Sequence, residues 1–370
     1  MAKIVSVDVW RIDLPPPVPR SDAIQSFVVQ ETPMTRITCD DGSDGVGCSY
    51  TIGTGGSSVT ALLADHLAPR LIGRDPACIE AIWRDLLFTT HATSVGAITS
   101  LALAAIDIAL WDWRCKRDGQ PLWRAAGGAK PRTPVYTTEG GWLHLATDAI
   151  VQDTVAAKEA GFQGAKIKVG LPRVADDVAR LRAVRAAVGD AFEIMLDANQ
   201  CFTLSEALRR AAAYAELGIA WFEEPLPADD IAGHARLAAS TPVPIAVGES
   251  LYSPSQFAAY IQQGACSIVQ VDVARIGGIT PWLKVAHMAE CHNLMVAPHF
   301  LMELHVSLTA ASPAARWVEY IPQLDAVAHS RVLIAAGEAV APDAPGLGID
   351  WRWDEIERRT TGRHHLQDDA

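Results

Sequence analysis

The sequence has no Cys-x-x-Cys pair, and its seven cysteines, an odd number, cannot all pair in disulfides within one chain. The first ten residues lack the basic start and long apolar run of a secretory signal peptide. No uncharged apolar stretch reaches the roughly 18 residues needed to cross a membrane. We therefore predict a cytoplasmic protein with reduced cysteines and no membrane contact.

An excess of positive charge is also missing. The 370 residues include 31 Lys and Arg against 43 Asp and Glu, for a formal net charge of −12. This balance excludes the basic footprint of a nucleic-acid-binding protein. It remains compatible with an anionic small molecule, because a few lysines can form a positive pocket inside a negative protein. The loop Gly53–Ser58 lacks the lysine of a phosphate-binding P-loop, so we predict no nucleotide site there.

Two kinds of periodicity divide the chain. Up to about residue 130, strand-like alternation at Ile4–Leu14 is followed by helical patterns, which predicts an α+β unit. Over residues 131–335, eight short apolar runs alternate with helical patterns, which predicts a (β/α)₈ TIM-type barrel in the α/β class. Residues 336–370 form a separate C-terminal segment. The eight predicted strands are Pro134–Thr138, Gly164–Val169, Glu193–Asp197, Ala220–Glu223, Ile245–Glu249, Ser267–Asp272, Leu294–His299 and Ala315–Glu319.

Three consecutive predicted strands end in a carboxylate. Asp197, Glu223 and Glu249 follow one another at intervals of one βα unit, so they are expected at the same mouth of the barrel. One such acid would as readily be a solvated strand end, but three clustered carboxylates repel one another unless a cation lies between them. All-oxygen ligands favour Mg²⁺, or Mn²⁺, over zinc.

Candidate bases lie on neighbouring strands. Lys166 and Lys168 flank Ile167, so both side chains share one face of a strand. Side by side, each ammonium group is expected to lower the pKa of the other, and a partly neutral lysine can serve as a base. His299 ends the seventh run and Asp272 the sixth, so an aspartate is expected to orient the imidazole and raise its basicity.

These motifs resemble the enolase superfamily, and within it the mandelate racemase subgroup. The resemblance covers nearly the whole chain and implies an N-terminal capping domain to which the C-terminal segment returns. Each motif alone is weak, but together they are specific. They are Lys166-x-Lys168, Leu196-Asp-Ala-Asn199, Trp221-Phe-Glu-Glu-Pro225, Gly248-Glu-Ser250, Asp272 with Gly277-Gly278, Pro298-His-Phe300, Trp317-Val-Glu319 and Pro345-Gly-Leu-Gly348.

The resemblance implies a role for each matching position. Lys168 would be the base on one face of the substrate, and His299 with Asp272 would act on the other. Lys166 would depress the pKa of Lys168 and touch the substrate carboxylate, and Glu319 would hydrogen-bond that carboxylate as a neutral acid. The remaining implied roles are Mg²⁺ ligation for Asp197, Glu223 and Glu249, a place near metal and substrate for Asn199, and an indirect role for Glu224.

The implied chemistry is removal of the proton next to a substrate carboxylate through an enediolate, as in Mg²⁺-assisted enzymes of this superfamily. The segments His299–His305 and Trp317–Glu319 are similar to talarate/galactarate dehydratases, so we predict dehydration of an acid sugar, either an aldarate or an aldonate. A racemase or epimerase of a 2-hydroxy acid and a cycloisomerase of a sugar-acid lactone are the alternatives. The complete set of ligands and bases argues against a non-catalytic binding barrel.

Substrate specificity is expected to come from loops. Ser21 and Asp22 in the first loop, Thr54 in the glycine-rich loop and Thr138 with Glu139 after the first barrel strand are candidate substrate contacts. The resemblance also implies a homo-oligomer, between a dimer and an octamer.

Overall fold

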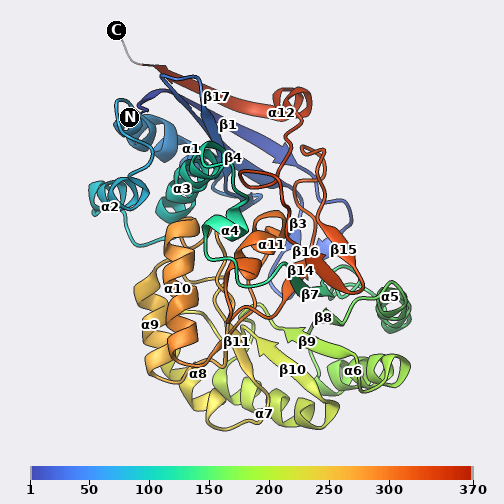
Figure 1. The fold of residues 1–370 in the computed structure, drawn as a ribbon. Coiled ribbons are helices and arrows are strands. Elements are labelled where there is room, and N and C mark those ends of the chain that lie inside the picture. Colours follow the sequence, from blue (N-terminus) through green and yellow to red (C-terminus); the bar gives the residue numbers. More distant parts are fainter. Residues whose placement is uncertain (1, 368–370) are drawn as a thin grey trace.

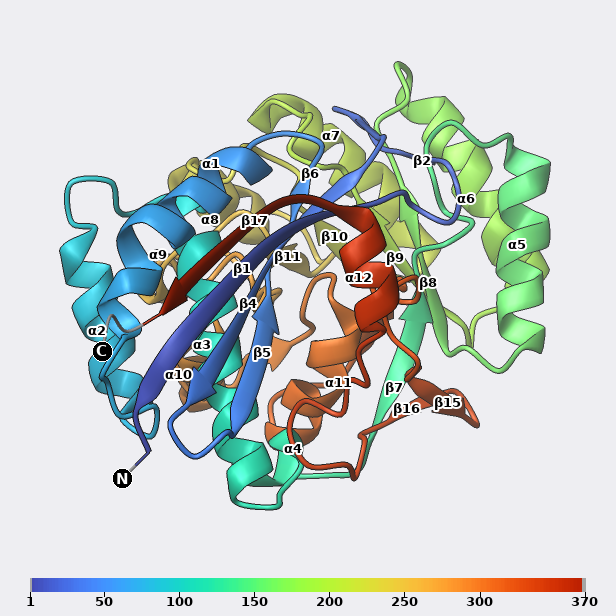
Figure 2. The same ribbon diagram turned by 90° about the horizontal axis from the view of Figure 1, so that it is seen from above.

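An antiparallel sheet covers one end of the molecule, and its central strand is β1 (Ile4–Leu14). Strand β4 (Gln30–Cys39) pairs with one side of β1 and β17 (Thr360–Gln367) with the other, while β5 (Asp44–Cys48) pairs with β4. The computed structural model describes residues 2–367. Figures 1 and 2 show this sheet lying across the top of a barrel, with the two ends of the described chain in the same layer.

The predicted helices of the α+β unit pack beneath this sheet. The central one, α3, is buried along most of its length, as its apolar pattern indicates. Strand β5 crosses it so closely that a Cβ added to Gly45 would lie 2.2 Å from the carbonyl oxygen of Ala109. The helical segments are α1 (Gly56–Ala61), the π-helix η1 (Leu62–Leu67), the 3-10 helix η2 (Ala68–Leu71), α2 (Ile79–Thr89), α3 (Ala97–Arg117) and α4 (Leu122–Ala125).

The predicted barrel is present, with its eight strands in sequence order around the wall. Seven strands pair in parallel succession from β7 to β13, β14 pairs with β7, and a bridge between Val296 and Ala315 closes the ring. The strands are β7 (Arg132–Thr137), β8 (Gly164–Lys168), β9 (Glu193–Asp197), β10 (Ile219–Glu223), β11 (Ile245–Val247), β12 (Ile268–Val269), β13 (Met295–Val296) and β14 (Val318–Tyr320).

Helices surround the barrel on the outside (Figure 1). They occupy the positions at which the helical patterns alternate with the apolar runs. They are α5 (Thr147–Glu159), α6 (Val174–Val188), α7 (Leu204–Tyr214) with the 3-10 turn η3 (Ala215–Leu217), α8 (Ile231–Ala238), α9 (Pro254–Gln262), α10 (Ile279–Cys291) and α11 (Met302–Ala311).

The last part of the chain contacts both units. Strands β15 (Leu333–Ala335) and β16 (Glu338–Val340) form a hairpin whose second strand pairs with β7 of the barrel. After α12 (Trp353–Arg359), β17 joins the N-terminal sheet. The division of the chain at 335/336 therefore cuts through a hairpin attached to the barrel, and the ranges 1–130, 131–335 and 336–370 remain a prediction.

Three short strands belong to loops that reach toward the barrel mouth. Strands β2 (Arg20–Ser21) and β3 (Ser26–Phe27) form a small hairpin, and β6 (Thr51–Ile52) pairs with β4. Within residues 2–367, no helix is both long and apolar enough to cross a membrane. All seven cysteines in this range are free; four are buried, and Cys78, Cys201 and Cys291 are exposed.

Candidate active site

Register between neighbouring strands brings the predicted strand-end acids together. Asp197 is aligned with Lys168 on one side and with Glu223 on the other. Glu249 lies two residues beyond the end of β11, in the turn that follows. Ligand oxygens of Asp197, Glu223 and Glu249 all lie within 4.8 Å of one another, and all three residues are buried.

The charges of this cluster fit a divalent cation. Four buried carboxylates, those of Asp197, Glu223, Glu249 and Glu319, surround only two ammonium groups, those of Lys166 and Lys168. Burial and the neighbouring Asp197 raise the pKa of Glu223 to about 7, so these acids do not all ionise easily without a further cation. A hard, all-oxygen donor set of this kind suits Mg²⁺.

The geometry of individual oxygens supports the same fit. In the described chain, Oε2 of Glu249 is buried without a hydrogen-bond donor. Nε2 of His299 lies 3.1 Å from it but outside hydrogen-bonding geometry. Oε2 of Glu223 is fixed by Nε2 of Gln270 at 2.6 Å and by the indole of Trp221 at 3.1 Å. Among the described residues, the cluster therefore combines the carboxylate of Glu223, which two hydrogen bonds hold, with an oxygen of Glu249 that accepts no hydrogen bond.

Both lysines point into the barrel, as predicted. Nζ of Lys166 lies 2.9 Å from Glu223 and 2.8 Å from Glu319. Nζ of Lys168 donates to Asp197 and, at 2.9 Å, to Oδ1 of Asn199. Although burial favours the neutral amine, Asp197 raises the pKa of Lys168 and outweighs the lowering effect of Lys166. The expected depression of the pKa of Lys168 is therefore not seen in this structure. A cation that shared the charge of Asp197 would remove the effect that raises this pKa.

Asp272 and His299 form the predicted pair. Nδ1 of His299 lies 2.8 Å from Oδ2 of Asp272, which fixes the tautomer and leaves Nε2 facing Glu249. Burial opposes ionisation of both groups, but the hydrogen bond from His299 holds the pKa of Asp272 at about 2. Burial lowers the pKa of His299, yet Glu249 and Asp272 raise it overall. The imidazole is thus a stronger base than an exposed histidine.

The neutral state of Glu319 was expected for the site that holds the substrate carboxylate, and it stays a prediction. Burial would favour the protonated acid, but the ammonium group of Lys166 holds the pKa of Glu319 well below its usual range. Oε1 of Glu319 also accepts from the hydroxyl of Thr138, and Oε2 accepts from the amide of Phe300 at 2.7 Å. In this arrangement, the neighbouring donors favour the ionised form of Glu319.

The proposed specificity residues divide between three places. Thr138 lies in the catalytic chamber, a cavity of about 20 Å³ whose wall includes Lys166, Lys168, His299 and Glu319. Thr54 lines a neighbouring cavity instead. Ser21 lies in neither wall, since its hydroxyl is directed to Ser26 within its own hairpin.

Several site residues were not anticipated. The hydroxyl of Tyr50 donates to Asp272 at 2.6 Å, and Nε of Arg275 donates to that hydroxyl at 3.0 Å. Arg275 falls inside the Asp272–Gly278 motif, which was a usable signal, whereas nothing in the sequence around Tyr50 indicates this contact.

Glu224 contacts Gln200 and lies outside the group of three clustered acids, consistent with an indirect role.

Comparison with known families covers nearly all of the chain. Residues 6–127 match the mandelate racemase/muconate lactonizing enzyme N-terminal domain. Residues 149–355 match the enolase C-terminal domain-like family. The first range covers most of the sheet-and-helix unit, and the second runs from α5 to α12, so that β7 and β17 lie outside both.

Individual proteins agree with this match. The L-talarate/galactarate dehydratase of Salmonella typhimurium is 38% identical over 91% of this chain and 86% of its own length. The 3,6-anhydro-α-L-galactonate cycloisomerase of Streptomyces coelicolor is 34% identical over 98% of this chain and 100% of its own length. The crystal structure of the Salmonella enzyme with Mg and L-lyxarohydroxamate superposes with a TM-score of 0.95 at 35% identity, covering 100% of this chain and 95% of that chain. The chain therefore belongs to the enolase superfamily, in the mandelate racemase/muconate lactonizing enzyme family.

Proposed function

We propose that this protein dehydrates an acid sugar to a 2-keto-3-deoxy acid. The reaction begins with removal of the proton next to the substrate carboxylate. The observation that carries the proposal is the meeting of Lys168 and His299 in the wall of one chamber, beside Lys166, Glu249 and Glu319. One group is available to accept a proton and the other to donate one. The similarity to an L-talarate/galactarate dehydratase supports this reaction over other reactions of the family.

The proposed reaction assigns one transfer to each base. Lys168 accepts the proton from the α-carbon, and the electrons of that C–H bond move into the carboxylate. The β-carbon–oxygen bond then breaks, and His299 gives a proton to the departing hydroxyl, which leaves as water. The enol that remains tautomerises to the 2-keto acid. Transfers of this kind between positioned groups typically contribute 10²- to 10⁴-fold in rate.

Mg²⁺ is the cofactor that the acid cluster fits, with Asp197, Glu223 and Glu249 as the residues that would hold it. When bound, Mg²⁺ supplies positive charge where the substrate carboxylate gains a second negative charge. A cation there would also offset the charge of Asp197, which raises the pKa of Lys168. The lowering effect of Lys166 would then remain, which favours Lys168 as a base.

Lys166 is proposed to hold the substrate carboxylate. Its ammonium group is held between the carboxylates of Glu223 and Glu319. A fixed positive charge stabilises developing negative charge without reorganisation during the reaction. Glu319 on β14, which accepts from the hydroxyl of Thr138 after β7, positions this lysine from the neighbouring side of the barrel wall.

The direct test incubates the protein with Mg²⁺ and a set of mono- and dicarboxylic acid sugars, with 2-keto-3-deoxy acids detected as semicarbazones. Formation of a keto acid from at least one acid sugar is expected. Racemisation of a 2-hydroxy acid in D₂O without any keto acid would instead establish a racemase or epimerase. NMR of products from sugar-acid lactones would reveal a cycloisomerase, a reaction named for one relative of this chain. A cytoplasmic location and a homo-oligomeric state are retained as predictions.

A further inference from the structure

The carboxylate of Glu223 is held more firmly on one oxygen than on the other. Oε2 accepts from Nε2 of Gln270 at 2.6 Å and from the indole nitrogen of Trp221 at 3.1 Å. Oε1 accepts from Nζ of Lys166 at 2.9 Å. Because a carboxylate oxygen has two lone pairs, both lone pairs of Oε2 are engaged and one on Oε1 is left. Glu223 can therefore offer a cation a single oxygen.

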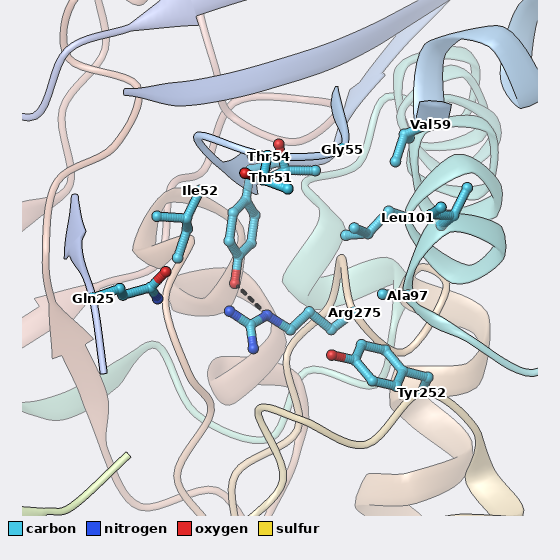
Figure 3. Close-up of a pocket in the computed structure, with 12 residues that line it drawn as sticks. Gln25, Thr51, Ile52, Thr54, Gly55, Val59, Ala97, Leu101, Tyr252 and Arg275 are labelled. Carbon is cyan, nitrogen blue, oxygen red and sulfur yellow. Dashed lines mark hydrogen bonds between the residues drawn. The ribbon is translucent and has the colours of Figure 1, made fainter. Parts of the chain in front are cut away.

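The carboxylate of Glu249 is not restricted in this way. Its Oε2 accepts no hydrogen bond within residues 2–367. Its Oε1 lies 3.6 Å from Nη1 of Arg275, which is beyond hydrogen-bonding distance. Nε of Arg275 donates instead to the hydroxyl of Tyr50 at 3.0 Å (Figure 3). The restriction is thus specific to Glu223 and comes from the two donors to its Oε2.

Both donors are fixed in the barrel. Trp221 lies two residues before Glu223 on β10 and is fully buried, and its ring centroid lies 5.3 Å from that of Tyr136, edge to face. Gln270 directly follows β12, is fully buried, and its backbone amide donates to the backbone oxygen of Val247 at 2.8 Å. Partners held in this way orient a metal ligand before the ion arrives.

The other end of the Gln270 amide indicates why a glutamine is present. Its Oε1 is buried and accepts no hydrogen bond from the described residues. A buried polar atom without a partner weakens the folded state, so stability does not account for this side chain. A methionine of similar length would fill the same space without an unpaired oxygen. It would not supply the donor to Oε2 of Glu223, which is the contact that distinguishes the two residue types.

We propose that Gln270 and Trp221 limit Glu223 to coordination through one oxygen, and that this limit raises the selectivity of the acid cluster for Mg²⁺ against Ca²⁺. Ca²⁺ takes about six to eight oxygen ligands and can bind both oxygens of a carboxylate, whereas Mg²⁺ takes about six ligands and keeps several waters. Engaging Oε2 removes a ligand that only the larger ion would use. Both residues are positioning residues, since they act through Glu223. The inference rests on the magnesium site of the proposed function and goes beyond it, because three carboxylates alone would suit either ion.

The test measures the Kd of Mg²⁺ and the Kd of Ca²⁺ by titration calorimetry, after dialysis of the protein against a chelator. Gln270→Met should shift the ratio of the two Kd values toward Ca²⁺ by about tenfold, because loss of an outer partner typically costs roughly 10- to 100-fold in affinity and only Ca²⁺ gains the freed oxygen. Trp221→Phe, which removes the second donor, should shift the ratio in the same direction. Gln263→Met, at an exposed glutamine just after α9, is the matched control and should leave the ratio unchanged. A ratio that stays at the wild-type value in both Gln270→Met and Trp221→Phe would overturn the inference.

Crystal structures with Ca²⁺ provide a second measurement, which for the wild type needs no variant to fold. Only Oε1 of Glu223 should lie within about 2.6 Å of the ion in the wild type, and both oxygens should do so in Gln270→Met. Two coordinating oxygens in the wild type would contradict the proposed restriction. Neither measurement requires a substrate, so the absence of a keto acid alongside a shifted Kd ratio would refute the dehydration and support the role of Gln270. If the wild type binds neither ion, the metal site fails, and the selectivity fails with it.

Discussion

Nδ1 of His305 donates a 2.7 Å hydrogen bond to the backbone oxygen of Phe300, the residue that follows His299. Its Nε2 accepts from the amide of Val273, the residue that follows Asp272, at 3.2 Å. One fully buried, neutral imidazole at the start of α11 thus ties together the backbone segments of the Asp272–His299 pair.

Replacing His305 by Phe should reduce kcat about tenfold and change KM less, because the two segments lose their common partner and the imidazole of His299 is less well oriented. His305→Gln should recover part of the loss, since an amide offers both a donor and an acceptor. Steady-state kinetics well below the melting temperature measure the effect. His234→Phe, at another buried histidine in α8, is the control and should leave kcat unchanged. Equal kcat values for His305→Phe and wild type would mean that His305 only fills space.

Lys168→Ala should abolish exchange of the α-proton at one face of the substrate, with a loss of at least about 100-fold. ¹H NMR in D₂O monitors the exchange, and titration calorimetry with Mg²⁺ checks that the acid cluster still binds. Exchange at the wild-type rate in a variant that binds Mg²⁺ normally would remove Lys168 from the role of base.

Mg²⁺ should stabilise the folded protein by mass action, by about 2.7 kcal/mol at a hundredfold excess over its Kd. Glu223→Gln should lose this stabilisation, because one of the three clustered carboxylates is gone. Glu193→Gln is a matched control, since Glu193 is exposed at the opposite end of β9 from Asp197. Thermal unfolding with and without Mg²⁺ measures the difference. A Glu223→Gln protein that keeps the full shift would place the ion elsewhere.

Asp107, buried in α3, should make stability depend on pH. Burial raises its pKa from 3.8 to about 7, so the folded state binds a proton more tightly than the unfolded state does. Its contribution therefore favours folding at low pH and is lost as the pH rises from about 4 to about 7, with an upper limit of about 4 kcal/mol. Asp107→Asn removes the charge. It retains a side-chain oxygen that can accept from the backbone amide of Thr280, as Oδ2 of Asp107 does in the wild type. In urea unfolding, the free energy of unfolding of the variant should rise relative to that of the wild type between pH 4 and pH 8. Parallel pH dependences of the two proteins would contradict the raised pKa of Asp107.

The order of the barrel strands and the ionisable residues near their ends could be predicted, because barrel strands combine apolar runs with ionisable residues at the mouth. The exact lengths of the strands could not be predicted, and β11, β12 and β13 end earlier than expected. Gly248 has a φ of 152°, and Pro298 lacks an amide hydrogen, so the backbone leaves the sheet before Glu249 and His299. These side chains consequently lie on turns beyond the strands.

The ionisation state of Glu319 and the contacts of Tyr50 depend on distances between strands and domains. Neighbouring charge, rather than residue type, decides the pKa of Glu319, and only the fold places Lys166 2.8 Å away. Tyr50 comes from the N-terminal unit, more than 200 residues from Asp272 in the chain. No local pattern reports such a pairing.

The pairing of β17 with β1 has a consequence for synthesis. Ser6 lies opposite Gln367, so β1 can find one of its neighbours only after the barrel that lies between them in the sequence has been synthesised. Until then β1 presents an open edge on that side, and such edges favour association with other chains. Newly made protein should thus pass through a short interval in which the barrel can form but the sheet above it is incomplete.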